Sequence, residues 1–160
     1  METQSKITNL PALIKLTQQW QKEGKKVVFT NGCFDIVHLG HIDYLEKARN
    51  LGDKMIVAIN TDQSVAHLKG PQRPIVNQEA RARMMAAFEF VDAVVMFGEE
   101  TPLNLIEAIK PDILVKGSDY LTENIVGSKI VLASGGKVET IDLVEGYSTT
   151  NIIQKIKQLK

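Results

Sequence analysis

The clearest structural pattern in the chain lies in residues 27–42, which read VVFTNGCFDIVHLGHI. Val27, Val28 and Phe29 form a short apolar run that is typical of a buried parallel strand, and Asn31-Gly32 ends the run with residues that favour a turn. Apolar residues then return at helical spacing from Ile42 onward, which predicts an amphipathic helix. The stretch therefore predicts a strand, a glycine turn and a helix in direct succession.

Two histidines, His38 and His41, fall in the first turn of this expected helix. Because they are three residues apart, they share one face of the helix. The free N–H groups and the positive dipole end of a helix N-terminus favour an anion such as phosphate. Gly40 has no Cβ, so a phosphate can approach the backbone between the two imidazoles. The pattern predicts a site for a phosphoryl group.

A histidine pair at a helix start has two other interpretations, a structural cap and a metal site. A zinc site needs further ligands, but the sequence has one cysteine, Cys33, one further histidine, His67, and no second short-spaced ligand pair. We therefore favour phosphate and expect no metal ion held directly by the protein. A helix start would lower the thiol pKa of Cys33, but a packing role fits that residue at least as well as a nucleophilic one.

The composition bears on the class of protein. A chain of 160 residues that is 44% hydrophobic and 24% charged suits one compact domain, 1–160. Its 19 basic and 19 acidic residues cancel, which argues against nucleic acid as a partner. It has neither the apolar segment of a signal peptide nor an apolar run of membrane-spanning length. We expect a cytoplasmic protein with no membrane partner.

Apolar runs and helical patterns alternate along the chain. Strands are expected at 27–29, 55–59, 91–97, 113–115 and 138–143. Helices are expected at 9–24, 39–50, 62–68, 79–90, 101–109, 128–134 and from 148 onward, the last with Ile152, Ile153, Ile156 and Leu159 facing inward. The alternation predicts an α/β fold, a doubly wound five-stranded parallel sheet with helices on both faces. Residues 1–25 would form an N-terminal helix extension of a catalytic core at 26–160.

Polar segments follow the expected strands at 31–41, 60–62, 116–120 and 147–150. In a doubly wound sheet the ligand binds beyond the carboxyl ends of the strands, so these segments predict one shared site, although ordinary loop polarity would look partly similar. The chain has no G-x-G-x-x-G after its first expected strand and no G-x-x-x-x-G-K-[ST], which argues against a dehydrogenase and a P-loop kinase.

Five motifs then resemble one family: FTNGCFDIVHLGH, LKGPQRP, FVDAVV, LVKGSDY and YSTTNII. H-x-G-H after a strand and a glycine turn is the signature of the nucleotidyltransferase superfamily. Together the motifs closely resemble the adenylyltransferase domain that activates D-glycero-β-D-manno-heptose 1-phosphate for lipopolysaccharide, over about residues 27–157. The resemblance implies a Rossmann-like nucleotidyltransferase fold in a stand-alone form, without the sugar kinase fused to many members. Ser118, where the family often has Gly, and Tyr147 depart from the pattern.

The resemblance implies transfer of AMP from ATP to the sugar 1-phosphate, which gives ADP-heptose and pyrophosphate. Mg²⁺ is expected with the ATP. As partners it implies ATP, the sugar 1-phosphate, a second copy of the chain in a homodimer and a separate sugar kinase. Two alternatives stay open: a cytidylyltransferase for glycerol 3-phosphate or a related polyol phosphate, and a noncatalytic nucleotide-binding sensor.

The resemblance also implies roles for individual residues. The catalytic residues are His38, His41 and Lys69. The nucleotide-binding residues are Cys33, Phe34, Gly40, Lys116, Gly117, Asp119, Tyr147, Ser148, Thr149 and Thr150. Asp35, Arg73 and Arg81 are implied to bind the substrate or its phosphate, with Asp35 orienting a histidine or helping to hold Mg²⁺. The alternatives are an ordinary solvated loop for Lys69 and Arg73, a helix surface for Arg81 and a plain N-cap for Ser148 and Thr149.

Overall fold

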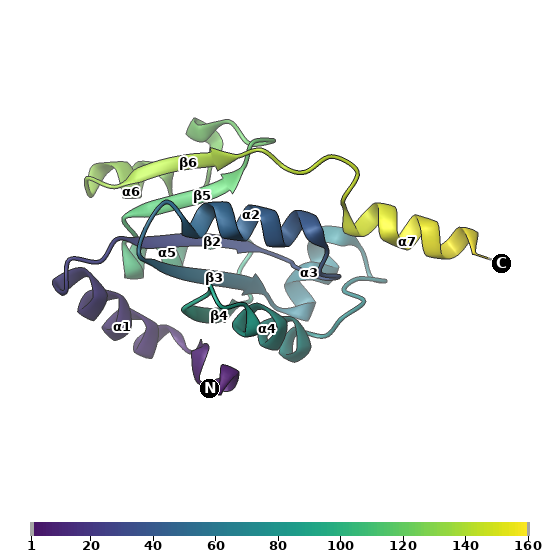
Figure 1. The fold of residues 1–160 in the computed structure, drawn as a ribbon, viewed down its shortest axis with the longest axis horizontal. Coiled ribbons are helices and arrows are strands. Elements are labelled where there is room, and N and C mark those ends of the chain that lie inside the picture. Colours follow the sequence, from purple (N-terminus) through teal and green to yellow (C-terminus); the bar gives the residue numbers. More distant parts are fainter. Residues whose placement is uncertain (1, 160) are drawn as a thin grey trace.

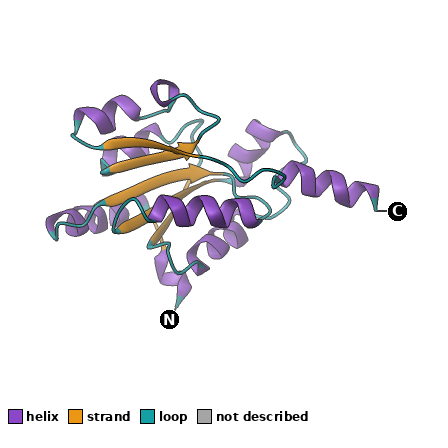
Figure 2. Cartoon of the chain, turned by 45° about the horizontal axis from the view of Figure 1, so that its top comes forward, coloured by secondary structure: helices purple, strands orange, loops and turns teal. Residues whose placement is uncertain are grey.

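The computed structural model describes residues 2–159, which form one parallel sheet between two layers of helices (Figures 1 and 2). The strands are β1 Ile7–Thr8, β2 Val27–Gly32, β3 Lys54–Asn60, β4 Ala93–Phe97, β5 Ile113–Gly117 and β6 Lys137–Ile141. The helices are α1 Leu10–Lys22, α2 Leu39–Arg49, α3 Asp62–Lys69, α4 Gln78–Ala87, α5 Leu103–Ile109, α6 Ser128–Ala133 and α7 Thr149–Gln158, with short 3-10 turns η1 Thr3–Lys6 and η2 Thr122–Asn124. The predicted doubly wound α/β class is confirmed.

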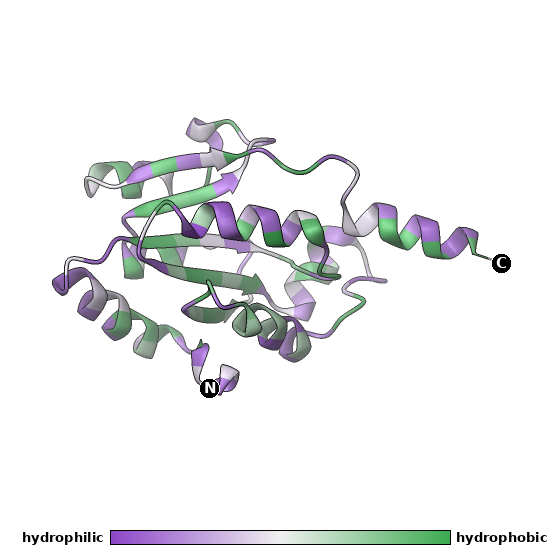
Figure 3. Ribbon diagram, viewed as in Figure 1, coloured by the Kyte–Doolittle hydropathy of each residue, from purple (hydrophilic) through white to green (hydrophobic). Residues whose placement is uncertain are grey.

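Successive side chains along the strands belong alternately to two clusters of buried residues, one on each face of the sheet. In β2, Val27 and Phe29 point to one face of the sheet and Val28 to the other, as the two-residue period of a strand requires. Residues of α1, α5 and α6 complete the first cluster, and residues of α2 and α4 complete the second. Figure 3 shows the resulting hydrophobic colour along β3. Both faces of the sheet are therefore covered, which is typical of parallel sheets.

The sheet has six strands in the order β1-β4-β3-β2-β5-β6, one more than the five predicted. The additional strand is β1, whose Ile7 and Thr8 pair with Val94 and Val95 of β4. Two residues are too few to show a strand period in the sequence, which is why the prediction missed it. Within the predicted extension, residues 2–25 thus contribute an edge strand as well as the predicted helix, and Leu13 and Trp20 of α1 belong to the core.

Helix α7 contradicts the prediction that its apolar residues face inward. It projects away from the sheet (Figure 1), and none of its 10 residues, all of them described, is buried. Ile156 is 57% exposed and Leu159, just beyond the helix, is 74% exposed. Figure 3 shows hydrophobic and hydrophilic residues alternating along it. An amphipathic pattern shows that a helix has an apolar face, but not which surface covers that face.

Within residues 2–159, no helix combines the length and the hydropathy needed to cross a bilayer.

The strand order reverses at β2. β3 and β4 follow on one side of β2, whereas β5 and β6 lie on the other side. The segments that leave β2 and β5 therefore diverge at the carboxyl edge of the sheet, which is the ligand-binding position in doubly wound folds.

Candidate active site

A cleft of about 590 Å³ opens at this edge of the sheet. Its walls come from the loop after β2, the first turn of α2, the end of β5 and the segment that leads into α7. All the predicted site residues except Arg81 line it: Cys33, Phe34, Asp35, His38, Gly40, His41, Lys69, Arg73, Lys116, Gly117, Asp119, Tyr147, Ser148, Thr149 and Thr150. The structure thus brings together residues that are up to 117 positions apart (150 − 33) in the sequence.

The two histidines form a stacked pair at the start of α2. His38 is the N-cap residue of α2, and its ring lies 3.8 Å from the ring of His41 between centroids, with 23° between the planes. Burial lowers the pKa of His38, and burial together with the neighbouring His38 lowers the pKa of His41 to about 4. Both imidazoles are therefore neutral at pH 7, and each has one N–H to donate.

Among the described residues, Nδ1 of His38 and Nδ1 of His41 are buried without a hydrogen-bond partner. Buried polar atoms in folded proteins are nearly always paired, and exceptions concentrate where a ligand binds. The pair therefore fits the predicted phosphoryl group better than a structural cap, since His38 makes no side-chain capping bond to α2.

Phe34 and Gly40 shape the space around the histidines. Phe34 adopts a positive φ of 47°, uncommon for a residue with a side chain, and its ring meets that of His41 edge-on at 5.3 Å. A Cβ on Gly40 would lie 3.1 Å from Nδ1 of His38 and 3.3 Å from Cβ of Tyr147. Glycine at this position thus allows α2 to approach both side chains closely.

Asp35 does not contact either histidine. Its side chain is 1% exposed and accepts hydrogen bonds from Nε of Arg73 at 2.6 Å and from the backbone N–H groups of Ile75 and Val76, each at 2.8 Å. Burial alone would raise the pKa of Asp35, but the bonds from Val76, Ile75 and Arg73 outweigh it and lower that pKa. Because the carboxylate is saturated with donors, the structure favours neither predicted role, orienting a histidine or holding Mg²⁺.

Arg81 is the predicted residue that the structure does not bring to the cleft. It is fully buried, and its guanidinium donates to the carbonyl oxygens of Val76 at 2.9 Å and Cys33 at 2.7 Å and to Oδ1 of Asp62 at 2.7 Å. The side chain has no exposed surface and does not line the cleft. Arg81 is thus neither a helix-surface residue nor a residue that reaches phosphate in this structure; it anchors the loop after β2 to α3 and α4.

Lys116, at the end of β5, holds its amine inside the cleft. Nζ donates to the carbonyl oxygen of Asn31 at 3.2 Å and lies 5.7 Å from the centre of the Tyr120 ring. Burial lowers the pKa of Lys116 to about 8. At Gly117 a Cβ would lie 2.6 Å from Oδ1 of Asp119, so the glycine allows that carboxylate to fold back over the strand end.

The Cys33 thiol lies against Asn60, the last residue of β3. Burial raises the pKa of the Cys33 thiol, contrary to the fall expected at a helix start, and its Sγ lies 3.9 Å from Oδ1 of Asn60. A protonated thiol fits the packing role rather than a nucleophile.

The two residues at the start of α7 have hydrogen-bond partners within the protein. Ser148 caps α7 by accepting from the N–H of Asn151 at 3.0 Å, and Thr149 Oγ1 donates to the carbonyl oxygen of Ile36 at 3.4 Å.

Several cleft residues were missed by the sequence reasoning. Asn60 and Tyr120 lie in polar segments that follow strands, so the sequence marked the segment but not the residue. Tyr44 follows His41 by three positions on α2, and its hydroxyl lies 2.7 Å from Oγ1 of Thr30. Residues 124–126 and Val144 give no signal, since they are mostly apolar and lie outside any predicted element. Leu143 was predicted as the last residue of a strand, but β6 ends at Ile141 and Leu143 lines the cleft.

The described residues contain no group of three or more His, Cys, Asp and Glu side chains that could hold a metal ion. Mg²⁺ takes most of its ligands from phosphate oxygens and water when it accompanies a nucleotide. The donor set therefore fits an ion held mainly by a triphosphate.

Comparison with known proteins shows which family the chain resembles. The family described as cytidylyltransferase-like matches residues 29–155. The bifunctional protein HldE of Methylobacillus flagellatus is 52% identical over 151 residues, which cover 94% of this chain and 31% of that protein. HldE of Syntrophotalea carbinolica is 51% identical over 156 residues, which cover 98% and 32%. The chain thus spans about a third of the length of these relatives.

Two solved structures share the fold. The lipopolysaccharide core biosynthesis protein from Thermoplasma volcanium aligns with a TM-score of 0.61 and 28% identity, over 78% of this chain and 100% of that one. Pantoate-beta-alanine ligase from Francisella tularensis aligns with a TM-score of 0.60 and 15% identity, over 94% and 76%, which shows a shared fold only. Since the family match extends over most of the sequence, from the middle of β2 into α7, this chain belongs to the cytidylyltransferase-like family.

Proposed function

We propose that the chain is an adenylyltransferase that transfers AMP from ATP to D-glycero-β-D-manno-heptose 1-phosphate and releases pyrophosphate. The observation that carries the proposal is the neutral, stacked pair of His38 and His41, with buried unpartnered nitrogens, at the strand-order reversal. The relatives named HldE and the lipopolysaccharide core biosynthesis protein support it.

In this reaction an oxygen of the sugar phosphate forms a bond to the α-phosphorus of ATP. The bond from that phosphorus to the bridging oxygen of the β-phosphate breaks, and pyrophosphate leaves with the electron pair. Little covalent chemistry is asked of the protein, so positioning and charge stabilisation supply the rate. Neutral His38 and His41 would donate hydrogen bonds to the α-phosphate, while Lys69 and Arg73 would stabilise charge on the leaving group.

Mg²⁺ would enter with ATP and neutralise part of the triphosphate charge. We further propose a cytoplasmic homodimer. Its sugar 1-phosphate must come from a kinase reaction, because the acceptor must already carry a phosphate on its anomeric oxygen.

The test is a grid of nucleotides and phosphorylated acceptors, with pyrophosphate release as the readout. ATP with heptose 1β-phosphate is expected to give the highest turnover. The family description, cytidylyltransferase-like, favours CTP as the competing nucleotide, and we test it with glycerol 3-phosphate as the acceptor. A higher rate for that pair would replace the heptose assignment, and nucleotide binding without turnover of any pair would favour a sensor.

A second expectation concerns pH and Lys116. Because burial lowers the pKa of Lys116 to about 8, its ammonium loses a proton as pH rises through that value. If the positive charge of Lys116 binds nucleotide, kcat/KM falls over the same pH range, because the pH dependence of that ratio reports pKa values of the free enzyme. In Lys116→Arg, whose guanidinium stays charged, the alkaline limb should move to higher pH. An unmoved limb would assign the titration to another group.

A further inference from the structure

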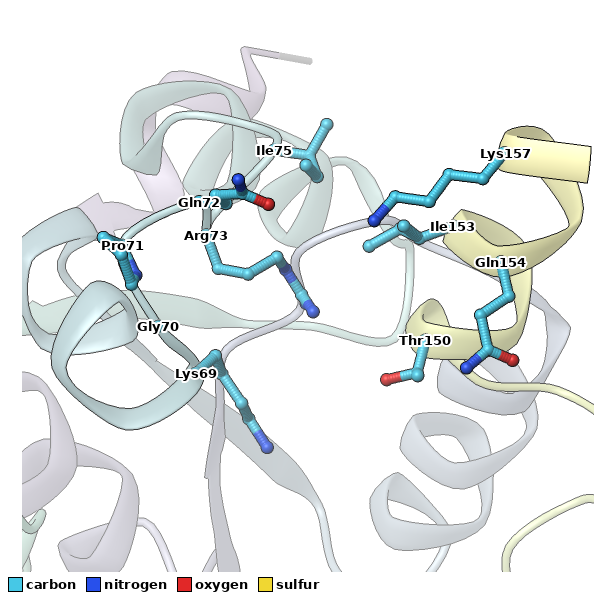
Figure 4. A pocket seen from close by; sticks show the side chains of 10 residues that line it. All are labelled: Lys69, Gly70, Pro71, Gln72, Arg73, Ile75, Thr150, Ile153, Gln154 and Lys157. Atoms are coloured by element: carbon cyan, nitrogen blue, oxygen red, sulfur yellow. The ribbon is translucent and has the colours of Figure 1, made fainter.

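The two sides of the active site are built differently. On one side, Lys69 and Arg73 of the loop that joins α3 to α4 face Thr150 of α7 across a space of about 480 Å³ (Figure 4), which opens into the cleft because all three residues line both. On the other side, His38 and His41 stand at the start of α2. Among the described residues, their Nδ1 atoms have no hydrogen-bond partner. The positions of the two rings therefore depend on how α2 is attached to the sheet.

Tyr44 attaches α2 to the sheet by a hydrogen bond. It follows His41 by three residues, so the two side chains share one face of the helix. Its hydroxyl lies 2.7 Å from Oγ1 of Thr30 in β2, and Oγ1 of Thr30 lies 3.0 Å from the carbonyl oxygen of Val115 in β5. Within residues 2–159, no other side-chain hydrogen bond joins α2 to a strand. This hydroxyl bridge, Tyr44 and Thr30, thus connects α2 with the two strands whose diverging ends form the cleft.

The direction of both hydrogen bonds follows from the number of protons. Thr30 carries one hydroxyl proton and the carbonyl oxygen of Val115 can only accept, so Thr30 donates to Val115. Tyr44 must then donate to Oγ1 of Thr30. Burial raises the pKa of Tyr44, so the phenol keeps this proton at neutral pH. The hydroxyl bridge therefore has one arrangement of protons, and it requires a hydroxyl group at both positions.

The hydroxyl bridge adds a direction to the packing of α2. Thr30 is fully buried, and Tyr44 is 7% exposed where it lines the cleft. The neighbouring buried residues of α2, Leu45 and Ala48, are apolar and pack in the second core cluster. Apolar packing is non-directional, whereas a hydrogen bond weakens steeply when its donor turns away from the acceptor. The bridge thus specifies where on the sheet the start of α2 lies.

We propose that Tyr44 and Thr30 are positioning residues, which through the hydroxyl bridge hold the start of α2 so that His38 and His41 face the α-phosphate together. Neither residue has to touch the reacting atoms. The reaction in which the histidines act rests on the proposed function, but the position of their rings in the free protein does not. A displacement of about 1 Å at a reacting group can cost about 10²-fold in rate, and loss of the bridge should cost part of that factor.

Steady-state kinetics with ATP and heptose 1β-phosphate measure the effect. Tyr44→Phe is expected to lower kcat by about fivefold to twentyfold while KM for ATP stays within about threefold, because the cations on the opposite side of the cleft remain. Thr30→Val keeps the shape of the side chain but removes the acceptor, so its kcat should fall similarly, and Thr30→Ser should recover most of the rate. The double variant with Tyr44→Phe and Thr30→Val should be no slower than the slower single variant, since both remove the same bond.

Thr17→Val is the matched control. Thr17 is also a fully buried threonine, and its Oγ1 donates to the carbonyl oxygen of Leu13 at 2.9 Å, but it lies in α1 and does not line the cleft. This variant should lower Tm about as much as Thr30→Val, because each loses one buried hydrogen bond, while its kcat stays within about twofold of the unaltered chain.

Proton NMR titration of the histidine rings tests the bridge without turnover. In the unaltered chain, burial and His38 lower the pKa of His41 to about 4. A displaced helix start admits water to the ring, so in Tyr44→Phe and Thr30→Val the pKa of His41 should rise toward its ordinary value of about 6.5. In Thr17→Val it should not move.

A normal kcat and an unmoved pKa of His41 in Tyr44→Phe, with only a lower Tm, would make the bridge a structural contact and overturn the proposal. Equally low kcat values for Thr30→Val and Thr30→Ser would overturn it too, because the hydroxyl would then not be the group that matters. If the unaltered chain does not turn over heptose 1β-phosphate, the proposed function fails, and the pKa of His41 in the two bridge variants alone supports or overturns the positioning role.

Discussion

His41→Ala is expected to lower kcat by about 10²–10³, or roughly 2.7–4 kcal/mol of transition-state stabilisation, the usual effect of removing one preorganised donor. The reason is its place at the start of α2, where its ring stacks on His38 and its Nδ1 is buried without a partner. Affinity for ATP should stay within about tenfold, because the donor acts mainly on charge that develops in the transition state. Steady-state kinetics and calorimetric titration with ATP measure the two quantities.

The structure also predicts which substitution recovers activity. The pKa of His41, lowered to about 4 by burial and by His38, makes the imidazole neutral at pH 7 in the free protein. An amide can replace a neutral donor, so His41→Asn should recover much of the lost rate. His67→Ala is the control, since His67 is exposed and does not line the cleft.

Two results would contradict this account. If His41→Ala keeps a normal kcat but unfolds at lower temperature, His41 is a structural residue of the helix start. If His41→Asn is as slow as His41→Ala, a positive charge or a second function of the ring is needed, and neutrality is the wrong explanation.

The part of the fold and site that could be predicted is the part encoded locally. The apolar run at 27–29 and the histidines after it placed β2 and the start of α2, because strands and helix starts depend on neighbouring residues. The predicted turn at Asn31-Gly32 was wrong, since β2 continues through both residues. The polar segments after β3 and β5 predicted further walls of the cleft, because the carboxyl ends of parallel strands lie at the same edge of the sheet.

The remainder depends on long-range contacts. Arg81 has an ordinary helical context in the sequence, and only the structure shows its bonds to Cys33, 48 residues away, and to Asp62. The periodicity of α7 indicated an apolar face but could not show that the core leaves it uncovered. In the same way, the sequence places Asp35 near the histidines but does not show that Arg73 and two backbone N–H groups occupy its oxygens.

Asp35→Asn is expected to destabilise the fold by about 2–4 kcal/mol. The amide keeps one acceptor oxygen but turns an NH₂ group toward N–H donors, and it leaves the guanidinium of Arg73 without its counter-charge. Removing one partner of a buried pair costs about 3–5 kcal/mol, and we place this case lower because the Arg73 side chain is 15% exposed at the cleft edge. In thermal unfolding this corresponds to a fall in Tm of about 5–15 °C. Asp142→Asn, an exposed carboxylate outside the cleft lining, should change Tm little.

The pH dependence identifies the cause of that loss. The pKa of Asp35 is lowered in the folded chain, so its ionised form contributes stability above the unfolded-state pKa, and this contribution disappears as pH falls through the folded-state value. The gap in unfolding free energy between the unaltered chain and Asp35→Asn should therefore be largest near pH 7 and narrow toward pH 3. A gap that stays constant with pH would mean that shape, rather than the carboxylate charge, holds the loop at Arg73. A double-mutant cycle with Arg73→Met then isolates the pair: strong coupling at pH 7 that fades in acid requires the Asp35–Arg73 contact, whereas additive losses would leave only the bonds to Ile75 and Val76.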